Sequence, residues 1–171
     1  MIAKIDKIAL WEALKLKLEE ELGIMEKAQK QSQEGATHEE GRAEGDKDMR
    51  ATEVSYLARG QALRVVELTE GLTKLSVVRP RAFRPSDPLA MGAIVQLEDQ
   101  DSGEQSTFLL APAGAGARLQ VSVGPGERML ELVVLTASSP LGRSLLGQHV
   151  GDEVELSVPA KKRSYVVVEV A

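Results

Sequence analysis

A short acidic segment, residues 35–48, holds the side chains best suited to chemistry. Magnesium is a hard ion that prefers oxygen ligands and often takes only one or two carboxylates from a given protein. Acids at the end of a rod can place such an ion in a cavity on another molecule, where it can activate water. The spacing alone selects no pair of ligands, and a solvated acidic loop with Asp46 capping the next helix stays an alternative. The five acids are Glu39, Glu40, Glu44, Asp46 and Asp48.

Two helical patterns flank this segment, from Ile5 to about Gln31 and from about Asp48 to Leu75. Apolar residues recur in steps of three and four, the spacing of a coiled-coil seam. Packed antiparallel, the two stripes hide each other and hold the acids at the tip of a hairpin that comprises residues 1–77. Gly60, on the second stripe, indicates close backbone approach. The stripes are Ile5, Ile8, Trp11, Leu14, Leu18, Leu22, Met25 and Ala28, and then Met49, Tyr56, Leu63 and Val66, widened by Leu57, Leu68, Leu72 and Leu75.

A second pattern begins after a linker at residues 78–91, which carries three prolines and three arginines. From residue 92 to residue 171 short segments rich in β-branched residues alternate with turn residues, which predicts a small, mostly antiparallel β domain. Ser138–Gly147 has a serine cap, an early proline and a closing glycine, so it predicts one short helix. The predicted strands are Ala93–Leu97, Ser106–Leu110, Leu119–Val123, Met129–Leu135, Glu153–Val158 and Ser164–Val170. The fold class is therefore α+β.

Composition excludes several functions. The chain has 171 residues and no cysteine, which rules out disulfides, thiolate metal sites and cysteine nucleophiles. The net charge of −5 argues against tight, independent binding of nucleic acid. No apolar run approaches the roughly 20 residues that span a bilayer, and no secretion leader is visible. We expect a cytoplasmic monomer that does not contact membranes.

The helical insert carries the most specific motif. Ser139-Pro140-Leu141-Gly142-Arg143-Ser144-Leu145-Leu146-Gly147, followed by Val150-Gly151-Asp152-Glu153-Val154, resembles the Ser-Pro-(Leu/Ile)-x-Arg-Ala-Leu-(Leu/Ile)-Gly…Gly-Asp-x-Val signature of the bacterial Gre transcript-cleavage factors. Tyr56-Leu57-Ala58-Arg59 is similar to the family's Tyr-x-Ala-(Arg/Lys) segment, and the predicted hairpin matches by architecture.

The resemblance implies a fold and a mechanism. In this family a coiled-coil hairpin precedes an FKBP-like β domain, and that domain docks on RNA polymerase at the rim of its secondary channel. The hairpin enters the channel, tip acids help to hold Mg²⁺, and the polymerase itself cuts backtracked RNA at the nascent 3′ end. The protein is then an accessory factor rather than an enzyme, and it binds no cofactor alone.

The resemblance also assigns residues. It implies that Ser139, Pro140 and Leu141 contact the polymerase, and that Asp46 and Asp48 are the candidates for the shared Mg²⁺. Arg50, Arg59 and Arg64 are candidate contacts to RNA or polymerase, with a solvated face that forms salt bridges to Glu53 and Glu67 as the alternative. DNA binding is a further expectation from the family.

The tip departs from the family pattern Gly-Asp-Leu-x-Glu-Asn-x-Glu-Tyr. If Asp48-Met49 stands for Asp-Leu, Ala51 replaces the glutamate; if Tyr56 is aligned instead, Met49 and Thr52 replace both acids. This keeps a non-cleaving regulator of the polymerase channel as an alternative. An FKBP-type isomerase is a weaker one, because the β domain offers only Phe108 and Tyr165 as aromatic residues. A plain coiled-coil adaptor is the last.

Overall fold

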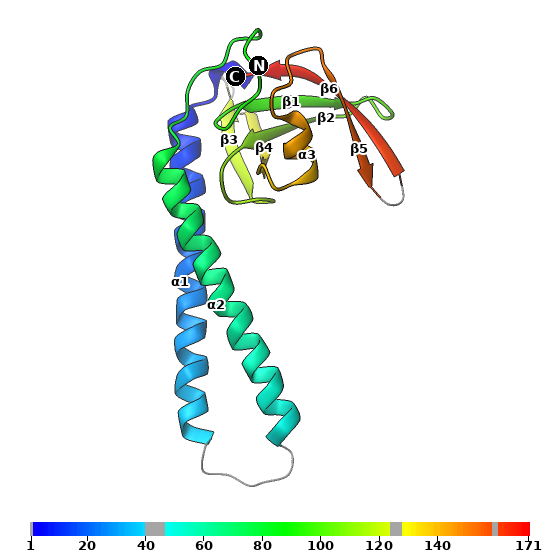
Figure 1. The fold of residues 1–171 in the computed structure, drawn as a ribbon. Helices are drawn as coiled ribbons and strands as arrows, with labels where there is room; N and C mark the ends of the chain where they lie inside the picture. Colours follow the sequence, from blue (N-terminus) through cyan, green and yellow to red (C-terminus); the bar gives the residue numbers. More distant parts are fainter. Residues whose placement is uncertain (1, 40–46, 124–127, 159–160) are drawn as a thin grey trace. The chain divides into compact units, whose positions relative to one another are not determined.

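The computed structural model describes residues 2–39, 47–123, 128–158 and 161–171. The chain forms two compact units. One, here the helical unit, is Leu16–Thr73; the other, here the β unit, comprises Met1–Lys15 and Lys74–Ala171. After a short 3-10 helix, η1 (Ile2–Lys4), two long helices precede the strands (Figure 1). These helices are α1 (Lys7–Glu39) and α2 (Lys47–Val77). α1 begins after the predicted Ile5 but ends well beyond Gln31, and α2 begins at Lys47, so helix extends into both ends of the 35–48 segment.

The two helices lie side by side in the helical unit and separate toward Glu39 and Lys47 (Figure 1). Leu18 and Leu68 are almost fully buried there, while Leu22, Met25 and Val65 are half-buried. On α2 the inner positions run in steps of three and four, as a seam requires: Ala58, Gln61, Val65, Leu68 and Leu72. At the base of the pair, in the β unit, the indole Nε1 of Trp11 donates to the carbonyl oxygen of Leu75 at 3.1 Å.

The predicted α2 stripe was partly wrong. Leu68 and Leu75 are buried, but Tyr56, Leu57, Leu63 and Val66 are exposed, and on α1 Ile8 is exposed while Leu10 is buried. Two faces of α2 carry apolar residues at the same spacing, and spacing alone cannot say which face meets α1. The face that carries Leu68 does. Gly60 is also exposed, and nothing lies within 4 Å of where its Cβ would be, so the predicted close approach is absent.

The β unit is built on a six-stranded sheet with the strand order β3-β4-β2-β1-β6-β5. Four of the pairings are antiparallel and β2 pairs with β4 in parallel, so the sheet is mixed. All six predicted strands are confirmed, with bounds that differ by at most three residues. The strands are β1 (Ile94–Asp99), β2 (Gln105–Leu110), β3 (Arg118–Val123), β4 (Arg128–Leu135), β5 (Glu153–Val158) and β6 (Lys161–Val170).

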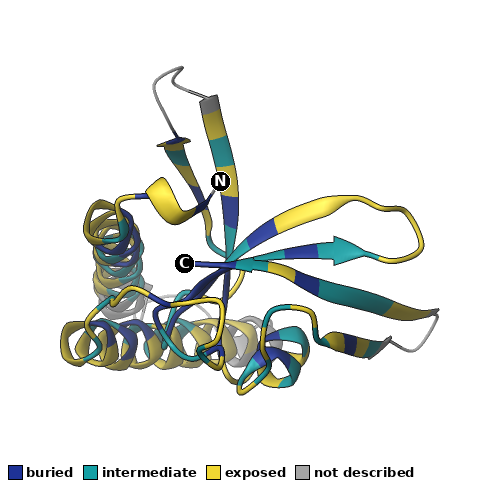
Figure 2. Cartoon of the chain, turned by 90° about the horizontal axis from the view of Figure 1, so that it is seen from above, coloured by how far each residue is buried: buried dark blue, intermediate teal, exposed yellow. Residues whose placement is uncertain are grey.

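Both faces of the sheet carry buried residues, since the neighbours Ile94 and Val95 on β1 are both fully buried, and the larger core cluster lies on the face of Val95. Figure 2 shows buried residues along the strands and exposed ones around the β1–β2 turn. Phe83 and Leu89, from the segment 78–91, are buried in this core with Val95, Leu110 and Leu145. The segment that joins α2 to the sheet is therefore part of the packed unit, and it fixes the entry to β1.

Candidate functional site

The short helix α3 (Pro140–Leu145) contains the most specific sequence motif, and a serine fixes its start. Ser139 Oγ accepts a hydrogen bond from the backbone N–H of Gly142 at 3.1 Å and donates to the carbonyl oxygen of Thr136 at 2.8 Å. Pro140 occupies the first turn, where a missing N–H costs nothing. The prediction of a serine-capped, proline-initiated helix is confirmed.

The three predicted contact residues differ in their exposure. Pro140 is exposed, whereas Ser139 is half-buried and bonded as above. Leu141 is half-buried and packs against the core of the β unit. Pro140 is therefore the exposed residue of this group, while its neighbours hold the helix in place.

Gly142 allows an unusually tight turn at this point. A Cβ at this position would lie 2.2 Å from the carbonyl oxygen of Thr136 and 2.6 Å from Ser139 Oγ. Arg143, next in the chain, is exposed and donates from Nη2 to the carbonyl oxygen of Ser138 at 3.3 Å. The start of α3 thus presents a proline and a guanidinium on a rigid frame.

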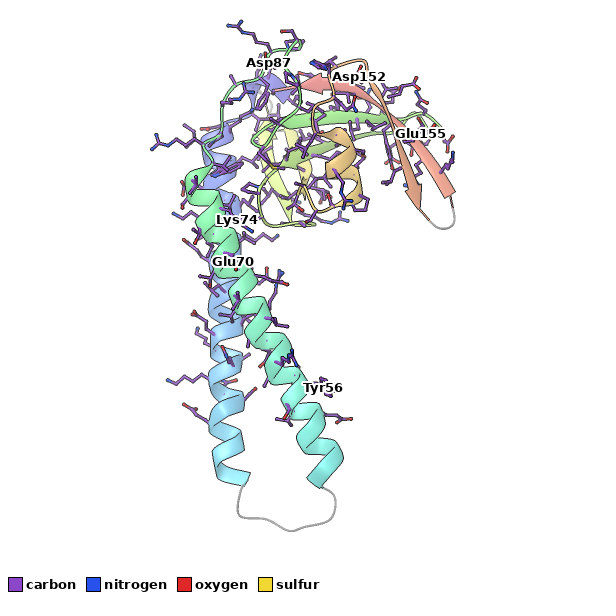
Figure 3. All side chains as sticks on the ribbon, viewed as in Figure 1. Tyr56, Glu70, Lys74, Asp87, Asp152 and Glu155 are labelled. Atoms are coloured by element: carbon purple, nitrogen blue, oxygen red, sulfur yellow. The ribbon has the colours of Figure 1, made fainter. Side chains whose placement is uncertain are left out.

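The turn after α3 completes the signature. Gly147 and Gly151 have φ values of +85° and +94°, which suit glycine. Between them the backbone N–H of His149 donates to Asp152 Oδ2 at 2.8 Å. The Gly-Asp of the signature therefore shapes the chain before β5, and Figure 3 labels Asp152 at this turn.

The α2 arginines have separate roles. Arg64 donates from Nη2 and Nε to Glu21 Oε1 on α1, at 2.6 and 2.9 Å, and from Nη1 to Glu67 at 3.2 Å. Its hydrogen bond to Glu21 is the main cause that raises the pKa of Arg64. Arg59 is exposed, and the side chain of Arg50 lies outside the described part of the chain. Arg64 thus forms a salt bridge between the two helices, and its partner Glu21 was not predicted from the sequence.

The predicted acidic ligands lie mostly outside the described residues. Glu40, Glu44 and Asp46 fall in 40–46; Glu39 ends α1 and Asp48 is the second residue of α2, but their side chains are not described. Elsewhere in the described chain no cluster of three or more histidine or acidic residues could hold a metal ion.

No helix among the described residues is long and apolar enough to cross a membrane.

A cation cluster at the base of α1 was missed by the sequence analysis. Lys7 Nζ donates to the carbonyl oxygens of Arg81 and Gly92, at 2.6 and 3.0 Å, and lies 4.7 Å from the centre of the Phe83 ring. The Arg81 guanidinium lies 3.9 Å from the centre of the same ring. Burial, with the charge of Arg81 as a second cause, lowers the pKa of Lys7 to about 8. No local pattern could have revealed a contact between residues this far apart.

Comparison with known proteins accounts for the α3 motif. Residues 84–171 match the family model described as "Transcription elongation factor, GreA/GreB, C-term". The chain belongs to the GreA/GreB family of transcription elongation factors. This matched segment contains the whole sheet and α3, and Pro140 is the exposed residue at the start of the α3 signature.

Curated GreA proteins extend the similarity. GreA of Rhizobium etli CIAT 652 is 28% identical over 172 residues, which cover 98% of both chains. GreA of Halorhodospira halophila is 29% identical over 107 residues, which cover 63% of this chain and 60% of the relative. GreA of Sulfurovum is 32% identical over 107 residues. The match to several GreA proteins therefore spans only about 60% of their length.

Solved structures of the GreA/GreB family are also similar, although with low superposition scores. Gfh1 of Thermus thermophilus is 23% identical, with 94% of each chain covered and a TM-score of 0.36. GreA/GreB from Nitrosomonas europaea is 24% identical over 60% of this chain and 78% of its own, with a TM-score of 0.37. The α+β class is shown by the chain's own elements, two long helices followed by a six-stranded mixed sheet. The comparisons support neither DNA binding nor likeness to FKBP isomerases.

Proposed function

We propose that this protein binds bacterial RNA polymerase through the α3 edge of its β unit and stimulates cleavage of backtracked RNA. The helix pair enters the secondary channel, and acids of the connection between α1 and α2 help to hold a catalytic Mg²⁺. The observation that carries the proposal is the combination of a GreA/GreB C-terminal match with a preceding helix pair whose connection is rich in carboxylates.

Docking is assigned to the start of α3. Pro140 is exposed beside the exposed Arg143, and both are held by hydrogen bonds of Ser139 and Ser138. A rigid apolar side chain next to a cation loses little conformational entropy on binding, which favours its use as a contact. Leu141 acts by anchoring the helix to the core.

A binding titration with purified polymerase tests whether the protein docks through the start of α3. We expect Pro140→Ala to weaken affinity while the melting temperature stays close to that of the wild type. Glu155→Ala, an exposed residue on β5, serves as the control in the same unit (Figure 3). Equal affinity of all three proteins would remove α3 from the interface.

The carboxylate side chains at the end of the helix pair suit the binding of Mg²⁺. Five carboxylates lie between Glu39, the last residue of α1, and Asp48, the second residue of α2, so all belong to one connection or its helix ends. Carboxylate oxygens are the ligands that Mg²⁺ prefers, and the ion keeps several waters, so two acids suffice. Asp46 and Asp48 would hold it. An ion held there would supply activated water and stabilise the leaving oxygen, while the chain's own part is to deliver negative charge on two paired helices.

Stalled, backtracked elongation complexes test whether the five acids stimulate RNA cleavage. Wild-type protein should shorten the RNA in a dose-dependent manner. A variant in which the five acids become Asn and Gln should bind polymerase normally and leave the RNA intact. Cleavage that survives in the variant would show that these acids are not the agents.

A second candidate is a channel-binding regulator that does not promote cleavage. The reason is specific: under either alignment of the tip, Ala51 or Met49 and Thr52 stand where the family has acids. This reading expects wild-type protein to bind polymerase, to leave backtracked RNA intact, and to inhibit cleavage when a competent factor is added.

A further inference from the structure

The face of α2 turned away from α1 carries an apolar stripe. Tyr56, Leu63 and Val66 expose 72%, 58% and 53% of their surface. Steps of seven and three place them on one side of the helix, opposite the seam residues. Single exposed apolar residues are ordinary, but a row at coiled-coil spacing is typical of a helix that packs against another helix.

Charged residues continue this stripe in a definite order. Arg59 lies between Tyr56 and Leu63, and Glu70 lies four residues beyond Val66, both exposed. Figure 3 labels Tyr56 and Glu70 on α2. If Thr73 is included, the residues of the stripe follow each other in steps of three and four. The basic Arg59 lies toward the N-terminal end and the acidic Glu70 toward the C-terminal end, with Leu63 and Val66 between them. Such a stripe is complementary to itself when it is reversed.

We propose that this stripe binds a second copy of the chain, with the two α2 helices antiparallel about a twofold axis. Leu63 then packs on Val66 of the partner subunit. Arg59 meets Glu70 of the partner subunit, and Tyr56 covers Thr73 of the partner subunit. Because the axis repeats each contact, the dimer gains two apolar layers and two ion pairs from one helix face.

Charge selects this arrangement over others. A parallel pair would set arginine against arginine and glutamate against glutamate, which is destabilising. A uniformly acidic or basic partner would leave one charge of the stripe opposed by its own sign. The stripe is short, so the dimer is weak and forms only at raised protein concentration. This departs from the monomer expected from the sequence, which assigned Tyr56, Leu63 and Val66 to the intrachain seam.

Sedimentation equilibrium of the full chain tests the dimer without any polymerase. The mass should rise from the 18.4 kDa of one chain toward twice that value as concentration increases. Arg59→Glu and Glu70→Arg should each weaken association about tenfold or more, because like charges then face each other. The double exchange should restore it. Melting curves check that all variants remain folded.

Engineered cysteines test the direction of pairing, since the chain has none of its own. A mixture of Tyr56→Cys and Thr73→Cys chains should form a mixed disulfide. Tyr56→Cys alone should not, because antiparallel pairing separates the two copies of position 56 by about 25 Å at about 1.5 Å per residue. Wild-type protein that stays monomeric at every concentration overturns the proposal. So does a double charge exchange that fails to restore association, or rapid crosslinking of Tyr56→Cys alone.

Discussion

Arg64 on α2 donates two hydrogen bonds to one oxygen of Glu21 on α1, from Nη2 at 2.6 Å and from Nε at 2.9 Å. The two side chains remain 46% and 38% exposed. This contact joins residues 43 positions apart at the level where the seam changes from leucine to smaller or polar residues such as Ala58 and Gln61. It therefore registers the two helices against each other toward the acidic end.

A double-mutant cycle on this pair should give a small coupling. Because both groups are partly exposed, we expect about 0.5–1 kcal/mol at low salt and less in 1 M salt. The cycle compares Glu21→Gln, Arg64→Met and the double variant by urea unfolding. A coupling near zero at low salt would mean that the contact does not hold the helices together.

Two leucines on α1 provide a matched test of the seam. Leu18 is 3% exposed and Leu16 is 57% exposed. Leu18→Ala should lower the free energy of unfolding by about 2–4 kcal/mol because it opens a cavity, whereas Leu16→Ala should change it little. Equal losses in the two variants, measured by thermal melting, would place the seam on a different face.

Two glycines should respond in opposite directions to alanine. At Gly60 nothing lies within 4 Å of the new Cβ, so Gly60→Ala should stabilise the helix by about 1 kcal/mol. At Gly142 the new Cβ would meet the carbonyl oxygen of Thr136, so Gly142→Ala should destabilise by about 1–3 kcal/mol. Denaturant midpoints at low protein concentration measure both. Stabilisation by Gly142→Ala would show that α3 has room at its first turn.

Lys7 should titrate near pH 8, since burial and the nearby Arg81 lower its pKa from 10.5 to about 8. Between these values the unfolded chain binds more protons than the folded chain, so the contribution of Lys7 to stability rises with pH across that window. The ¹³Cε resonance of Lys7, assigned with Lys7→Arg, measures the midpoint. A midpoint near 10.5 would show that the two carbonyls and the Phe83 ring outweigh burial.

The sequence predicted the β unit well for a local reason. Alternating apolar residues and glycine turns determine each strand almost independently, and the cap of α3 is complete within Ser139–Gly142. The helix faces were harder, because Tyr56, Leu63 and Val66 follow the same spacing as the true seam. The Lys7 cluster could not be predicted from the sequence, because it joins residues 7, 81, 83 and 92, which share no local pattern. The tip acids came from composition and family resemblance, and they remain predictions.

The Mg²⁺ dependence of RNA cleavage tests the central claim most directly. In stalled, backtracked complexes, wild-type protein should lower the Mg²⁺ concentration that gives half-maximal cleavage, because its tip acids help to hold the ion. The variant with Asp46→Asn and Asp48→Asn should bind polymerase equally well and lose that shift. If wild type and variant give the same Mg²⁺ dependence while both occupy the polymerase, the protein does not act by placing a metal ion.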